Sequence, residues 1–146
     1  MSALQILLDE FARRIGSSPF DVVADQARFV CNDRFTVDLF LDTRYECIRI
    51  GTQVGQSLVA APAHDVYWNC VSRAQREDVR FEVGWNAYTG EMLSMSAMPV
   101  TGLDIEVFMA WVERFLDRST EVADAWLAAE NPPSGGLPMA ECRSFA

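Results

Sequence analysis

Residues 35–42, FTVDLFLD, alternate between two kinds of side chain. The odd-numbered positions are all large and apolar, and three of the four even-numbered ones are polar. A period of two is typical of a strand with one buried face. Short polar breaks at 32–34 (NDR) and 43–44 (TR) flank this stretch. Residues 27–31, 35–42 and 45–51 are therefore predicted to form an antiparallel meander of three strands.

Phe40 stands out because it falls among the polar residues of the predicted outer face. Its ring is either covered by another element or part of an exposed binding surface, and the sequence leaves both readings open. Ile48 and Ile50, which alternate with Cys47 and Arg49 in the next strand, raise the same question.

Two more strands are predicted downstream, at 79–85 and 93–97, because apolar residues again recur at every second position. Thr89-Gly90 supplies the turn between them. Three amphipathic helices complete the chain. The first covers 3–15, with Ser2 and Gln5 as a capping box and Gly16 as its end. Ile6 lies off its apolar face, either as a partner contact or as a stray surface residue.

The second predicted helix runs from Pro62 to about Arg76. Trp68 lies off its apolar stripe, which favours burial against a second copy of the chain. The third helix is predicted to start with a capping box of Thr101 and Asp104. Its inner face is expected to consist of Val107, Phe108, Trp111, Val112, Phe115, Ser119, Val122 and Trp126.

The order helix, three strands, helix, two strands, helix predicts an α+β fold, with about five antiparallel strands and three helices on one face. Residues 1–130 are expected to form one domain, and the Pro/Gly-rich residues 131–146 a flexible tail. Residues 103–130 carry seven acids against two arginines. This acidity is either a solvated outer face or a docking face for a basic partner.

The composition argues against several classes of function. A net charge of −9 disfavours nucleic acid, and the absence of lysine removes Schiff-base and phosphate-loop chemistry. The longest uncharged stretch, 50–64, has 15 residues and is too short and polar to span a bilayer. The N-terminus lacks a basic signal-peptide region, so the expected location is the cytoplasm, with the four cysteines as thiols. No metal or other cofactor is expected.

Catalytic signals are weak. His64 is the one histidine, so a Ser/His or Cys/His enzyme would depend on it, with Cys70 or Cys31 as the candidate thiol. Asp38 and Asp42 lie about 13 Å apart along a strand, too far for paired glycosidase acids. Neither a phosphate-binding glycine loop nor a hydrolase elbow is found. The pattern therefore favours a binding protein that is not an enzyme.

Together these motifs resemble the class I type III secretion chaperones, the Tir-chaperone-like family of effector chaperones. The resemblance covers most of residues 3–130 and is carried by LLDEFARRIG (7–16), FTVDLFLD (35–42), GEMLSMSAMPVTGLD (90–104), VFMAWVERFL (107–116) and ADAWL (123–127).

The resemblance implies a cytoplasmic homodimer that holds an extended, unfolded N-terminal segment of a virulence effector, keeps it competent for secretion and needs no cofactor. The secretion ATPase is a further candidate partner. On this basis Ile6, Phe40, Ile48 and Ile50 are expected to bind effector. Trp68, Val71, Phe81 and Trp85 are expected to form the dimer interface. The alternative is a chaperone-like adaptor or regulator of the same fold with no secreted cargo.

Overall fold

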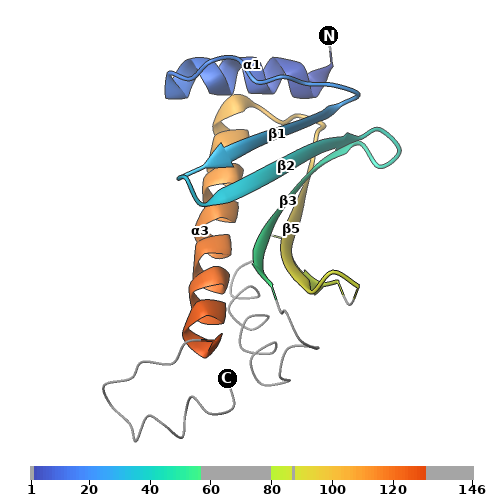
Figure 1. Cartoon of the computed structure of the whole chain (residues 1–146). Helices are drawn as coiled ribbons and strands as arrows, with labels where there is room; N and C mark the ends of the chain where they lie inside the picture. The colour runs from blue at the N-terminus through green and yellow to red at the C-terminus, as the bar shows by residue number, and fades with distance from the viewer. Residues whose placement is uncertain (1, 57–79, 87, 131–146) are drawn as a thin grey trace, which may run out of the picture.

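The computed structural model describes residues 2–56, 80–86 and 88–130 (Figure 1). Its elements are α1 (Ala3–Ile15), β1 (Gln26–Cys31), β2 (Phe35–Asp42), β3 (Cys47–Gln56), β4 (Phe81–Trp85), β5 (Glu91–Pro99) and α3 (Ile105–Glu130). This α+β arrangement with a five-stranded antiparallel sheet confirms the predicted fold class. The predicted helix at 62–76 and the tail at 131–146 lie outside the described residues.

The strand order in the sheet is β1-β2-β3-β5-β4. The first three strands form the predicted meander, although β3 continues to Gln56. β5 then pairs with β3, and β4 pairs with the other side of β5. The pairing of β3 with β5 joins segments that are distant in the sequence, so local periodicity does not predict it. It places Gly51 opposite Met95 in the middle of the sheet.

The ends of the two helices follow from capping. In α1, Ser2 Oγ accepts a hydrogen bond from the Gln5 backbone N–H at 3.2 Å, and Gly16 ends the helix with a left-handed φ of 70°, as predicted. The predicted capping box of α3 is wrong. Asp104 is the N-cap itself, because its Oδ1 accepts from the Val107 N–H at 2.9 Å. Thr101 lies in the preceding turn.

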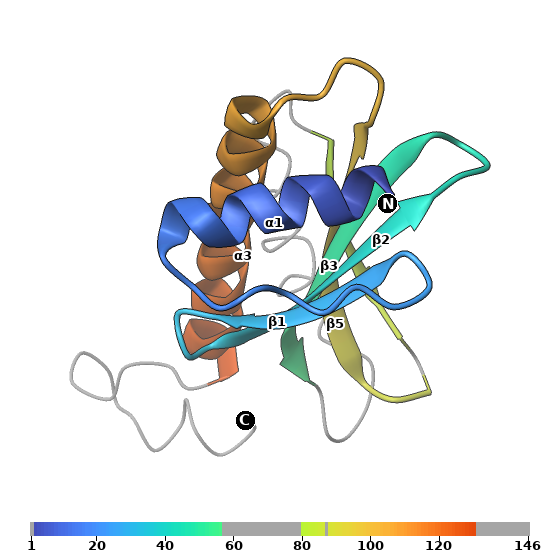
Figure 2. The same cartoon turned by 90° about the horizontal axis from the view of Figure 1, so that it is seen from above.

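α1 and α3 form one continuous core with the inner face of the sheet. α1 crosses near the N-terminal end of α3 in both views (Figure 1 and Figure 2). Phe11 joins the layers, since its ring packs edge-on to Phe108 of α3 at 5.9 Å and contacts Phe29 of β1 at 6.4 Å. No helix in the described ranges is long and apolar enough to cross a membrane.

The expected outer-face placement of Ile48 and Ile50 is wrong. Both are core residues, with exposed fractions of 0% and 2%. The register explains the error, because Ile50 pairs with Leu39 and Ile48 with Leu41, and directly paired residues share a face of the sheet. Arg49 and Gly51 consequently face outward. Val107, expected on the inner face of α3, is 46% exposed, whereas Phe108 next to it is fully buried.

Phe81, expected at a dimer interface, belongs to the core of its own chain. Its ring contacts Phe115 of α3 at 5.5 Å, and only 7% of the residue is exposed. Trp85, four residues after Phe81 in β4, is half-buried. Trp68 and Val71, the other two residues of the predicted interface, fall in the range that the structure does not describe.

Candidate functional site: exposed apolar surfaces

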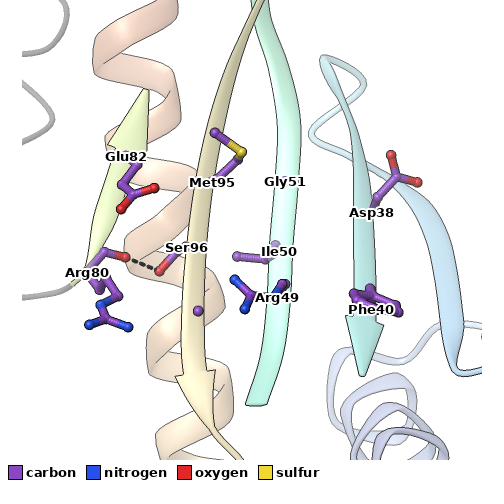
Figure 3. A pocket seen from close by; sticks show the side chains of 10 residues that line it. Asp38, Phe40, Arg49, Ile50, Gly51, Arg80, Glu82, Met95 and Ser96 are labelled. Carbon is purple, nitrogen blue, oxygen red and sulfur yellow. Dashed lines mark hydrogen bonds between the residues drawn. The ribbon is translucent and has the colours of Figure 1, made fainter. Parts of the chain in front are cut away.

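The outer face of the sheet carries a hollow of about 300 Å³ (Figure 3). Gly51 and Ala97 have little or no side chain, so they leave a depression in the surface where β3 and β5 pair. Phe40 from β2 and Met95 from β5 line it, and each is 38% exposed. The remaining lining residues are Asp38, Arg49, Ile50, Arg80, Glu82 and Ser96.

Charges around this hollow are balanced. Asp38 forms an ion pair with Arg28 of β1 at 2.7 Å, which raises the pKa of that guanidinium. Arg49 bonds Asp42 at 3.1 Å. Burial raises the pKa of Asp42, but hydrogen bonds, led by the one from Arg49, lower it more, so its pKa is below the usual value. The outer face therefore offers apolar side chains without a strong excess of either charge.

A second apolar surface lies where α1 meets the start of α3. Ile6, which is 56% exposed, lines a hollow of about 510 Å³ there. The other residues of this hollow are Leu7, Asp9, Glu10, Arg13, Leu103, Asp104 and Ile105. Hydrogen bonds from Arg13 and then Arg14 lower the pKa of Glu10. Arg14 also bonds Glu106 of α3 and so links the two helices. We call this surface the α1–α3 groove.

The opposite flank of α1 carries a further hollow of about 720 Å³, lined by Ser2, Gln5, Asp9, Val22, Ala24 and Asp25. We call it the α1–turn groove. Its wall is a tight turn in which Val23 and Gln26 exchange two backbone hydrogen bonds of 2.9 and 3.0 Å. Ala24 and Asp25 both have positive φ, and Val23 is 73% exposed. Sequence reasoning missed this turn because it lacks the glycine or asparagine that such turns prefer.

β1 is the edge strand on one side of the sheet, with no further strand beside it among residues 2–56, 80–86 and 88–130. Gln26 directs its backbone N–H and C=O away from β2, and both form hydrogen bonds with the backbone of Val23. Backbone groups of alternate residues in a strand point the same way, so Arg28 and Val30 also direct theirs away from β2. The Val30 side chain is 64% exposed. This edge can accept a short added strand.

The structure does not bring the four predicted effector-binding residues together. Ile6 and Phe40 are exposed but line two separate hollows, Ile6 where α1 meets the start of α3 and Phe40 on the outer face of the sheet. Ile48 and Ile50 are core residues. Of the predicted enzyme residues, His64 and Cys70 are outside the described ranges. Cys31 is a half-buried free thiol whose pKa is raised by burial.

Comparison with known proteins gives matches in structure. The sequence matches no protein-family model and no curated protein sequence. A chain of the HopA1–SchA chaperone–effector complex matches with a TM-score of 0.68 and 13% identity, over 84% of this chain and 94% of that one. A chain of the ExsC–ExsE complex matches with a TM-score of 0.69 and 20% identity, over 83% and 91%.

The structure of the Yersinia pestis type III secretion chaperone SycH with a fragment of YscM2 matches at a TM-score of 0.63 and 11% identity, over 82% of this chain and 98% of that one. The fold is also found in YbjN from E. coli, a proposed transcription regulator, at a TM-score of 0.58 and 12% identity, over 83% and 87%. The chain therefore has the class I type III secretion chaperone fold.

Proposed function

We propose that this protein is a cytoplasmic secretion chaperone that binds an extended, unfolded segment of a type III effector and keeps it soluble until export. The observation that carries the proposal is the fold. It matches a chain of a chaperone–effector complex and a type III secretion chaperone solved with a protein fragment, each over more than four fifths of this chain's length. The same proposal makes the protein a binding protein without catalytic activity, with the secretion ATPase as a further partner.

Two features of the surface support this function. The open edge of β1 offers backbone groups at Arg28 and Val30, which bind an added strand with little demand on its sequence. Ile6 in the α1–α3 groove, and Phe40 beside the outer hollow, offer apolar contacts to the side chains of that segment. Such contacts cover the apolar residues of an unfolded chain and keep it from aggregating.

A homodimer belongs to the same proposal. Of the expected interface residues, Trp85 is half-buried, and its indole Nε1 is shielded from solvent without a hydrogen-bond partner in the described ranges. A second copy that packs over β4 would cover the exposed part of this ring. Light scattering on the purified protein measures the mass. A monomer of 16.4 kDa at micromolar concentration would contradict the dimer.

The test of the proposed function uses a matched pair of variants on α1. Ile6 and Ile15 are 56% and 51% exposed and point in opposite directions, since nine residues amount to two and a half helical turns. Ile6→Gln is expected to reduce recovery of a co-purifying secreted protein from the native bacterium at least fivefold, as measured by quantitative mass spectrometry. Ile15→Gln is expected to leave recovery unchanged. Equal recovery by both variants would remove Ile6 from the site.

The second candidate function is that of an adaptor or regulator without secreted cargo, and the structural match to YbjN favours it. The same co-purification separates the two. A chaperone is expected to capture a secreted protein through an unfolded segment that is degraded by protease outside the complex. An adaptor is expected to capture folded, non-secreted partners. Recovery of only the latter would replace the chaperone proposal.

A further inference from the structure

We infer that the surface around α1 selects a polypeptide segment in which an apolar side chain is flanked by lysine or arginine. This inference rests on the proposed function and specifies the chemistry of the bound segment. It starts from two exposed apolar side chains, Ile6 in the α1–α3 groove and Val23 beside the α1–turn groove.

The basic side chains at α1 are already neutralised. Arg13 and Arg14 both bond Glu10, and Arg14 in addition bonds Glu106. Their positive charge is therefore largely cancelled for an incoming ligand.

Apart from Glu10, the acidic side chains that line the two grooves are not neutralised in this way. Asp9 lines both grooves and accepts a hydrogen bond at 2.9 Å from the uncharged amide of Gln5. Asp104 accepts from a backbone N–H, and Asp25 lies in the strained turn. None of these three carboxylates forms an ion pair with another described residue. Both flanks of α1 thus combine apolar surface with uncompensated negative charge.

Charge complementarity decides among the possible occupants. A second copy of this chain carries a net charge of −9 and would bring further negative charge to the grooves. A segment with apolar and basic side chains satisfies both features at once. The outer hollow of the sheet, where acidic and basic residues are balanced, has no such preference. We therefore place recognition of positive charge at α1.

Three peptides of 15 residues test the inference. They share one sequence with a central Ile-x-Leu anchor in a Ser/Thr background, and four flanking positions are Lys, Gln or Glu. Binding to the full-length protein is measured by fluorescence anisotropy. At about 50 mM salt the Lys peptide is expected to bind at least tenfold more tightly than the Glu peptide. At about 500 mM salt this ratio is expected to fall to about threefold or less, because exposed charges are screened.

Two variants with the same change in net charge locate the effect. Asp9→Asn is expected to weaken binding of the Lys peptide three- to tenfold and to leave the Gln peptide unchanged. Asp117→Asn removes an exposed charge of α3 that lies outside both grooves, and it is expected to change neither. Equal losses in the two variants would show that net charge and not this surface is responsible, and would overturn the inference.

The possible failures can be told apart. Equal affinity for the Lys, Gln and Glu peptides would overturn the charge preference and leave the proposed chaperone function in place. Failure of all three peptides to bind, in a protein that retains its circular dichroism spectrum, would count against both. If Asp9→Asn or Ile6→Gln converts a dimer to a monomer, α1 faces a second copy of the chain and the inference is wrong.

Discussion

Gly55 on β3 lies directly against the indole ring of Trp126 on α3. A Cβ atom at Gly55 would come within 2.6 Å of Cδ1 and 2.9 Å of Cγ of that ring. Trp126 is only 4% exposed, so its ring has little room to move. The bare backbone at Gly55 thus allows the C-terminal half of α3 to pack closely on β3, next to a change of register between β3 and β5.

Gly55→Ala is expected to lower the free energy of unfolding by about 1–3 kcal/mol, because the new methyl group forces the buried indole out of place. Gly51→Ala is the control in the same strand. There the nearest atom to a new Cβ is the Ser94 carbonyl oxygen at 3.6 Å, an ordinary contact, so stability is expected to stay within about 1 kcal/mol of wild type. Urea denaturation measures both. Similar losses in the two variants would contradict the role of Trp126.

Local patterns were sufficient to predict much of this fold. The alternation in 35–42 defined β2, and Ser2 with Gly16 defined both ends of α1. Which residues of β3 face the core could not be decided in the same way. Cys47 and Ile48 are consecutive and both buried, so the alternation of buried and exposed residues is broken at the start of the strand. The pairing of Ile50 with Leu39 and of Ile48 with Leu41 decides which side chains of β3 face the core, and this pairing is a property of the assembled sheet.

The candidate site was less predictable than the fold. Ile6 was found because it breaks the apolar stripe of its helix. The α1–turn groove was missed, because Ala24 and Asp25 adopt positive φ without the residues that usually indicate it. The outer hollow depends on Gly51 and Met95 lying side by side, which requires the pairing of two strands that are distant in the sequence.

Phe40 and Ile50 lie on opposite faces of the sheet, so the same substitution at the two positions is expected to have very different effects on stability. Phe40→Asp changes an exposed position and is expected to alter stability by less than about 1 kcal/mol. Ile50→Asp buries an unpaired charge, which costs about 3–5 kcal/mol, and is expected to give largely unfolded or insoluble protein. Ile50→Val keeps the experiment quantitative, with an expected loss of about 0.5–1.5 kcal/mol in urea denaturation. A soluble, stable Ile50→Asp protein would return Ile50 to the outer face.

Asp42 is expected to contribute to stability in a pH-dependent way. Its carboxylate accepts hydrogen bonds from the backbone N–H groups of Arg44 and Tyr45 as well as from the Arg49 side chain. Because its pKa in the folded chain lies below its value in the unfolded chain, the stabilisation is complete above the unfolded pKa of about 3.9. It is lost as the pH falls through the folded pKa.

Asp42→Asn is therefore expected to reduce stability at pH 7. Below about pH 4, the variant is expected to lose less stability than wild type as the pH falls, because it lacks the carboxylate that becomes protonated. Melting temperatures measured between pH 7 and pH 2.5 follow both effects. The matched control is Asp117→Asn, which removes an exposed carboxylate on α3 that forms no ion pair with another described residue. Parallel pH curves for wild type and Asp42→Asn would show that this carboxylate does not contribute.

Ser94 and Ser119 form a polar contact inside the core, where their hydroxyl oxygens lie 2.7 Å apart and neither residue is exposed. Ser119→Ala leaves the Ser94 hydroxyl buried without this partner and is expected to cost about 1–3 kcal/mol. The double variant Ser94→Ala/Ser119→Ala removes both polar groups and is expected to recover most of that loss. A double-mutant cycle in urea measures the coupling between them. Strictly additive losses would mean that each hydroxyl finds another partner, and that this hydrogen bond does not help to hold α3 on β5.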